Sequence, residues 1–110
     1  MKSKRSKACD FTIEVKKTIV QRDKGKCLFC RLEKYGKSQC DWIMDIMHYI
    51  PRSSGGLGIP ENGVLGCRYH HDLLDNGNKG YRQWMLDDMR DYLRSQYPEW
   101  NENDLYYTKG

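Results

Sequence analysis

The 110-residue sequence has no apolar stretch long enough to span a membrane, because charged and polar residues interrupt its hydrophobic runs. Its first ten residues, MKSKRSKACD, run from basic to mixed polar sequence and lack the apolar core of a signal peptide. There is also no internal repeat and no low-complexity block. We therefore expect a soluble cytoplasmic protein of one domain, residues 1–110, with a core modest enough for a bound metal to matter to its stability.

The cysteines are odd in number, five in all, and their spacing favours metal binding in a reducing compartment over disulfides. Two ligand pairs stand out, Cys27 with Cys30 in CLFC and Cys67 with His70 in CRYH. Ligands three positions apart can reach one ion from a single turn, and structural zinc takes four sulfur or nitrogen ligands. The sequence predicts that these four residues hold a structural zinc ion.

Other interpretations of the cysteines stay open. The pairs could be ordinary buried thiols beside a helix histidine. Cys40 could replace His70 as the fourth ligand, and Cys9 is expected to be a free thiol without a role.

Charge is distributed unevenly along the chain. Residues 1–37 contain twelve Lys or Arg against four Asp or Glu, whereas residues 38–110 contain seven against eleven. The basic third is a candidate surface for a polyanion, although residues 1–10 taken alone are expected to be a solvated basic tail.

Hydrophobic periodicity and turn residues predict an α+β fold in which a central unit, residues 26–77, lies between two helices. We expect the apolar stripe of the second helix, which includes Met85 and Met89, to pack against the first helix. The predicted elements are a helix over 12–24, a strand over 42–50, a long connection over 52–63, a short strand at 64–65, a helix over 68–74, a closing helix over 80–97 and a C-terminal arm over 98–110.

The central unit also carries residues that suit phosphodiester hydrolysis. That reaction needs a base to activate water and a cation to stabilise charge on the phosphate and the leaving oxygen. His48 is a candidate base, because imidazole titrates near neutral pH, and His71 is a candidate ligand for a divalent ion. Each alone has a plainer interpretation, as a structural or surface histidine, and Asn62 alone would suggest only a turn.

The segments GKCLFC, MHYIPRSSGGLG and ENGVLGCRYHHDLLDNG, between Gly25 and Gly77, resemble the HNH endonuclease family, whose fold is a ββα-metal finger. The resemblance implies metal-dependent cutting or nicking of DNA. It assigns His48 as general base, Asn62 as the residue that fixes the loop through backbone hydrogen bonds, and His71 as ligand of a catalytic Mg²⁺, Mn²⁺ or Ni²⁺ ion.

The sequence departs from the family pattern at Met47, where many members carry an Asp or His metal ligand. Either His71 holds the ion with water and DNA phosphates, or Asp45 helps, or catalysis is weak or lost. We expect the first, because strand alternation points Asp45 away from His48. Arg52 and Arg68 are candidate phosphate-binding residues because they lie near the site in sequence.

The segments HYIPRSSGGLG and YPEWNENDLYY are most similar to small free-standing HNH proteins of tailed phages and prophages of Gram-positive bacteria. This similarity implies a role in DNA packaging beside the large terminase subunit, in the host cytoplasm. Two alternatives are a non-catalytic, zinc-stapled nucleic-acid-binding module and a packaging accessory protein that docks through the arm around Trp100 and Tyr106.

Overall fold

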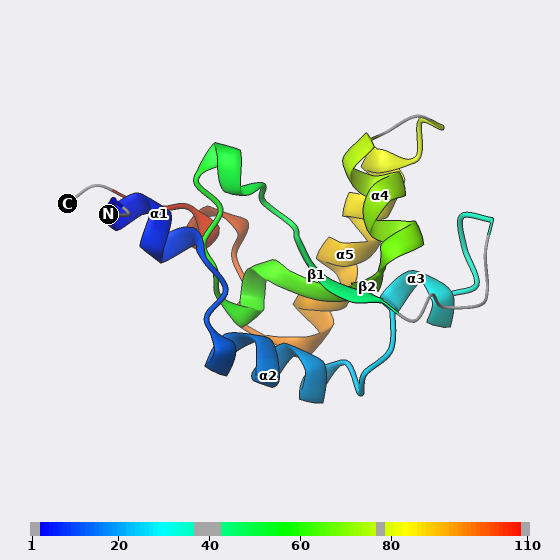
Figure 1. Cartoon of the computed structure of the whole chain (residues 1–110), viewed down its shortest axis with the longest axis horizontal. Helices are drawn as coiled ribbons and strands as arrows, with labels where there is room; N and C mark the ends of the chain where they lie inside the picture. Colours follow the sequence, from blue (N-terminus) through cyan, green and yellow to red (C-terminus); the bar gives the residue numbers. More distant parts are fainter. Residues whose placement is uncertain (1–2, 37–42, 77–78, 109–110) are drawn as a thin grey trace.

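The computed structural model describes residues 3–36, 43–76 and 79–108, and shows the mixed α+β fold that the sequence predicts (Figure 1). Cys40 and Trp42 lie outside the described residues. The elements follow in the order α1 (Lys4–Cys9), α2 (Ile13–Arg22), α3 (Leu28–Arg31), β1 (Met44–His48), the 3₁₀ turns η1 (Arg52–Ser54) and η2 (Pro60–Asn62), β2 (Gly63–Cys67), α4 (Arg68–Asn76), α5 (Arg82–Gln96) and η3 (Glu102–Leu105).

The two strands form an antiparallel sheet that pairs His48 with Gly63 and Met44 with Cys67. The predicted order of strand, loop, strand and helix is therefore confirmed, with β2 longer than the two residues expected. Cys67 ends β2 and Arg68 begins α4 with no residue between them. This direct junction brings the end of the sheet and the first turn of α4 to one place.

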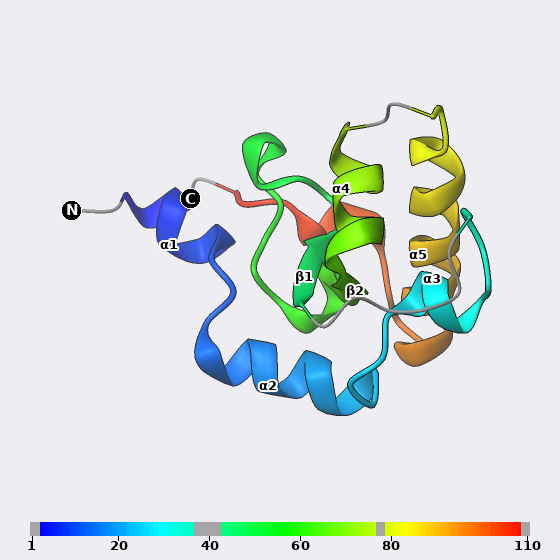
Figure 2. The same cartoon turned by 45° about the vertical axis from the view of Figure 1, so that its right-hand side comes forward.

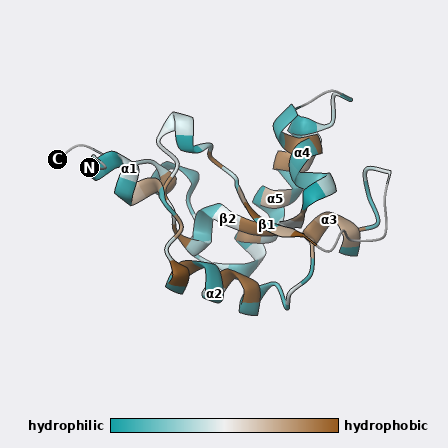
Figure 3. Cartoon of the chain, in the orientation of Figure 1, coloured by the Kyte–Doolittle hydropathy of each residue, from teal (hydrophilic) through white to brown (hydrophobic). Residues whose placement is uncertain are grey.

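The core lies between the sheet, α3 and the two C-terminal helices, and Figure 3 shows apolar residues gathered on the strands and α3. Met85, Met89 and Leu93 of α5 are fully buried there with Phe29 and Met47. Ile19 of α2 is also fully buried, but it lies outside this cluster. Met85, Met89 and Leu93 of the stripe share this cluster with residues of α3, α4 and the sheet, while Tyr92 of the same stripe contacts Arg22 of α2, the first predicted helix.

A buried polar network joins α2 to the rest of the molecule instead. The Asp23 carboxylate, with no exposed surface, accepts hydrogen bonds from Arg22, the Leu65 backbone N–H and the Tyr92 hydroxyl. Arg22 also donates to the Gly63 carbonyl, at 2.6 Å. Pairing and hydrogen bonds offset the free-energy cost of burying these charges. The network therefore fixes α2 against β2.

The N-terminal residues predicted to be a solvated tail form helix α1, which packs on the loop between the strands. The Ser3 hydroxyl caps the helix, and Cys9 at its end is buried. The Gly58 backbone N–H donates to the Ala8 carbonyl, at 2.9 Å. A Cβ atom at Gly58 would lie 2.1 Å from the Asp10 carbonyl oxygen, so only glycine permits this close approach.

The same loop is held from the other end of the chain. Leu57 donates its backbone N–H to the Leu105 carbonyl, and Tyr107 donates to the Gly55 carbonyl. Figures 1 and 2 show α1 and the segment after η3 close to the loop on one side of the molecule. No helix among the described residues is both long and apolar enough to cross a membrane.

Candidate functional site

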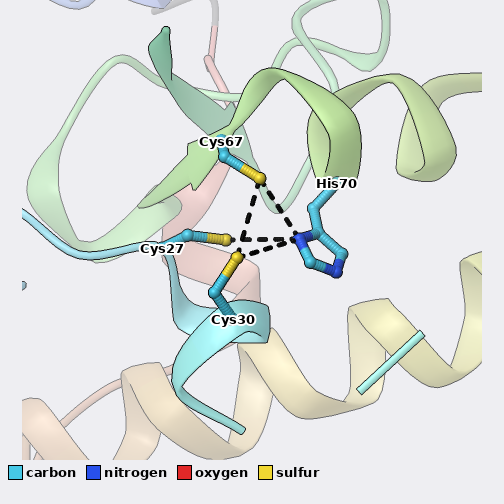
Figure 4. Close-up of side chains that lie close together, drawn as sticks. All are labelled: Cys27, Cys30, Cys67 and His70. Atoms are coloured by element: carbon cyan, nitrogen blue, oxygen red, sulfur yellow. Dashed lines mark hydrogen bonds between the residues drawn. The ribbon is translucent and has the colours of Figure 1, made fainter. Parts of the chain in front are cut away.

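The four predicted zinc ligands come together from three elements (Figure 4). Cys27 precedes α3 and Cys30 lies within it, Cys67 ends β2, and His70 lies in the first turn of α4. All four side chains are buried. Turn, strand end and helix therefore meet at one point, as the two ligand pairs in the sequence indicate.

Four of the distances within this Cys3His cluster are close to those around a tetrahedral ion, and all of its ligand atoms lie within 4.8 Å of one another. The sulfur atoms of Cys30 and Cys67 are 3.8 Å apart, and Nδ1 of His70 lies 3.6, 3.5 and 3.3 Å from the sulfurs of Cys27, Cys30 and Cys67. Bonds of about 2.3 Å to sulfur and about 2.0 Å to nitrogen place tetrahedral ligands roughly 3.8 Å and 3.6 Å apart. The cluster could hold a metal such as zinc.

The hydrogen bond at the second ring nitrogen of His70 also supports a role for His70 as a metal ligand. Nε2 lies 3.0 Å from the Lys34 carbonyl oxygen, which can only accept, so the proton of the neutral ring belongs on Nε2. The lone pair of Nδ1 is then directed into the cluster. Burial raises the pKa of Cys27, which makes a thiolate there costly without a bound cation.

A second region, which we call the His48 hollow, opens on the side of the sheet where α1 ends and α2 begins. It encloses about 800 Å³ and is far more open than the buried cluster. Its lining residues are Cys9, Asp10, Phe11, Thr12, Ile13, Lys16, Met44, Asp45, Ile46, His48, Arg52 and His71. The hollow therefore brings His48 and His71 together with the segment that connects α1 to α2.

His48 is held in a defined orientation by that connecting segment. Its Nε2 lies 3.2 Å from the Cys9 carbonyl oxygen, and its ring centroid lies 4.2 Å from that of Phe11. A carbonyl can only accept, so Nε2 carries the proton and Nδ1 holds the lone pair. Burial lowers the pKa of His48, although the Cys9 carbonyl opposes this effect, and so favours the neutral ring.

His71 lies between two carboxylates. Its Nδ1 is 2.9 Å from Asp45 Oδ2, and its Nε2 is 3.0 Å from Oδ2 of Asp75, one helical turn further along α4. The expectation that Asp45 points away from the site is wrong, because its side chain reaches α4 and borders the hollow. Hydrogen bonds from Arg68, and then from His71, lower the pKa of Asp45 and keep it ionised.

Met47, where the resemblance to HNH proteins led us to look for a metal ligand, does not line the hollow. Its side chain is fully buried in the core, and its Sδ and Cε atoms lie 2.5 Å from where a Cβ atom at Gly66 would be. Met47 is therefore a packing residue, and the carboxylates beside His71 come from Asp45 and Asp75.

Asn62 is buried and makes three hydrogen bonds to the backbone. Its Oδ1 accepts from the Ile50 N–H, at 2.7 Å, and its Nδ2 donates to the carbonyls of Ile50 and Leu57. The Asn62 carbonyl also accepts from the Tyr49 N–H. These bonds tie the chain just after His48 to the end of the loop.

The two arginines predicted to bind phosphate are both paired with carboxylates. Arg52 binds Asp10 and donates to the Ser6 hydroxyl, at 2.6 Å, and it borders the hollow. Arg68 binds Asp45 through two nitrogens, at 2.8 and 3.3 Å. Arg68 therefore orients a carboxylate beside His71, whereas Arg52 lines the His48 hollow.

Sequence reasoning missed several residues at the hollow. Asp75 could have been found from its spacing, because residues four apart share a helix face. The Cys9 carbonyl and Phe11 left no signal, since both contact His48 from almost forty positions away.

Comparison of the chain with family models, with curated proteins and with solved structures finds no match.

Proposed function

We propose that the protein is a metal-dependent DNA endonuclease or nicking enzyme of the HNH type. The observation that carries the proposal is the pairing of His48 and His71 in one hollow, with His48 fixed so that Nδ1 is a proton acceptor. Together with the order β1, loop, β2, α4 and the backbone hydrogen bonds of Asn62, this supports the function that the motif resemblance implies.

The residues around His71 fit a divalent ion. The 2.9 Å between Asp45 Oδ2 and His71 Nδ1 is close to the separation of about 3.0 Å expected for adjacent ligands of an octahedral ion with bonds near 2.1 Å. An ion bound by Nδ1 would replace the hydrogen bond between His71 and Asp45, and Asp75 would then accept the remaining ring proton from Nε2. Asp45 and His71 would hold Mg²⁺, Mn²⁺ or Ni²⁺, which would neutralise charge on the phosphate and the leaving oxygen.

The chain itself supplies the proton transfer and the orientation. Nδ1 of His48 accepts the proton of the attacking water, while the Cys9 carbonyl and the Phe11 ring keep the imidazole in that tautomer and plane. Asn62 fixes the backbone on both sides of the loop. Arg52 offers a positive charge to the phosphate at the edge of the hollow.

In this proposal the Cys3His cluster holds zinc and does no chemistry. Four protein ligands leave no position open to water, and the ion joins α3, β2 and α4. The proposal therefore assigns stability to the closed Cys3His cluster and catalysis to the open His48 hollow.

The biological setting that we propose is DNA packaging in a phage-infected bacterium, with the large terminase subunit as partner in the host cytoplasm. It rests on the similarity of the HYIPRSSGGLG and YPEWNENDLYY segments to small phage HNH proteins. A pull-down of terminase with the purified protein, with and without DNA, tests the partnership.

The catalytic proposal is tested by plasmid cleavage in a series of divalent ions. His48→Ala should slow nicking by about 10²- to 10⁴-fold, the usual contribution of a general base. His71→Ala should also lose activity, and the zinc content and circular dichroism of both variants should match the wild type. Asp72→Asn, an exposed carboxylate change on α4, is the matched control and should cut at the wild-type rate.

Cleavage by His48→Ala at the wild-type rate would contradict the assignment of the base. DNA binding by the wild type without cleavage in any divalent ion would favour the non-catalytic nucleic-acid-binding alternative.

A further inference from the structure

A second hollow adjoins the first on the side of α1. It encloses about 510 Å³ and shares Cys9 and Arg52 with the lining of the His48 hollow. Its lining residues are Ser3, Arg5, Ser6, Cys9, Arg52 and Ser53. We call it the Arg5 hollow, and its position makes it a continuation of the space in front of His48.

The lining of the Arg5 hollow suits an anion. It contains two guanidinium groups and three hydroxyl groups, and no carboxylate residue is part of it. Helix α1, with the sequence KRSKAC, contributes further positive charge and no acidic residue. Guanidinium groups bind phosphate through charge-assisted hydrogen bonds, and serine hydroxyls add neutral donors.

The two arginines are already held in position by the protein. Arg5 Nη2 donates to the Ser53 carbonyl, at 3.1 Å, and Arg52 Nη2 donates to the Ser6 hydroxyl. Arg52 is paired with Asp10, whereas among the described residues no carboxylate pairs with Arg5. Arg5 therefore brings a positive charge without a carboxylate partner among the described residues, and its hydrogen bond to Ser53 favours a direction of the side chain along the hollow.

We propose that the Arg5 hollow binds a backbone phosphate of the nucleic-acid strand next to the phosphate that is cut. This inference rests on the proposed nuclease function. A nucleic-acid strand carries one phosphate per nucleotide, so a strand with one phosphate at His48 and His71 must place others in the adjoining space. Arg52 lies at the border of both hollows, and Arg5 receives the strand beyond it.

This assignment makes the contact sequence-independent. Phosphate contacts fix the register of the protein on the strand but do not distinguish bases. The Arg5 hollow therefore contributes affinity, salt dependence and the direction in which the strand leaves the site.

The test measures DNA binding without cleavage. A fluorescein-labelled duplex is titrated by anisotropy, across a salt series without added divalent ion, against proteins that all carry His48→Ala to keep the DNA intact. Arg5→Gln in this background should raise Kd by about fivefold at roughly 0.1 M salt and lower the slope of log K against log salt by about one. Arg5→Lys should recover part of the loss.

Two controls separate a local contact from diffuse charge. Lys7→Gln removes the same charge from α1 at a residue that does not line the hollow, and Arg94→Gln removes it from the exposed face of α5. Both should change Kd by less than twofold. Zinc content and circular dichroism establish that Arg5→Gln is folded.

Equal effects of Arg5→Gln and Lys7→Gln would overturn the proposed subsite, and so would a Kd and salt slope unchanged by Arg5→Gln. A wild-type protein that binds DNA but never cuts it would contradict the nuclease function while leaving the Arg5 comparison decisive for the subsite. A protein that binds no DNA would overturn both.

Discussion

Consecutive residues of α4, His70 and His71, belong to the Cys3His cluster and to the His48 hollow, and the two regions differ in burial and in the groups that surround each histidine. His70 is fully buried among three sulfurs, whereas the His71 side chain retains 28% of its surface and faces two carboxylates. Successive residues on an α-helix project about 100° apart, so one turn of α4 supplies both regions. A change at His70 should therefore affect the stability of the fold, whereas a change at His71 should affect only the proposed catalysis.

Removal of the metal from the Cys3His cluster should have the largest effect. A structural zinc site contributes roughly 10 kcal/mol or more, which is comparable to the whole stability of a small domain. A strong chelator, or Cys30→Ser, should therefore unfold the protein, as measured by circular dichroism and by the zinc content of the purified chain.

The matched control is His71→Ala, which should keep both the zinc and the thermal midpoint. A Cys30→Ser protein that retains a cooperative thermal transition at the wild-type temperature would show that the cluster does not carry the fold.

Asp45→Asn should have the next largest effect, and only in the open region. Loss of the carboxylate beside His71 should raise the divalent ion concentration needed for half-maximal cleavage by about 10- to 100-fold. Zinc content should not change, because Asp45 lies outside the cluster. A metal titration of plasmid nicking measures the effect, with Asp72→Asn as control.

If Asp45→Asn leaves the metal requirement unaltered, the ion is held by His71 with water and phosphates alone, as first expected from strand alternation. The experiment thus decides between the two arrangements of the catalytic ion.

Phe11→Ala should have the smallest effect. Removal of the ring that lies against His48 should lower the cleavage rate by about tenfold, because a base that leaves its working orientation loses part of its contribution. The ¹⁵N chemical shifts of the His48 ring should show mixed tautomers in Phe11→Ala and the Nε2–H form in the wild type.

Val15→Ala provides the comparison for Phe11→Ala, because Val15 is also half-buried but does not contact His48 by ring packing. Phe11→Leu should restore part of the rate. A Val15→Ala variant with the same shift change and the same loss of rate would reduce the role of Phe11 to general packing.

The parts of the molecule that the sequence predicted are those in which local spacing carries the information. The order of strand, loop, strand and helix followed from periodicity and turn residues, and Cys27, Cys30, Cys67 and His70 followed from paired ligand spacing. Both patterns, periodicity and ligand spacing, can be recognised in the sequence because each depends on residues only a few positions apart.

The parts that could not be predicted depend on contacts between distant residues. Helix α1 has no apolar periodicity, and what holds it is the Ser3 cap and its contact with Gly58. Arg52 looked free to bind phosphate because Asp10, its partner, is forty-two positions away. For Asp45, alternation gives the direction of the Cβ atom but not how far a carboxylate at the end of the strand reaches.

The loop between the strands is held by segments that lie far apart in the sequence and are therefore synthesised at different times. Ala8 closes this loop from one side, and Leu105 and Tyr107 close it from the other through backbone hydrogen bonds. During synthesis, residues 27–70 are made before residues 105 and 107, so the four residues of the Cys3His cluster can come together before the loop is closed. The loop that follows His48 acquires these hydrogen bonds only after residues 105 and 107 have been made, so in the proposed nuclease the surroundings of His48 would be completed after the Cys3His cluster.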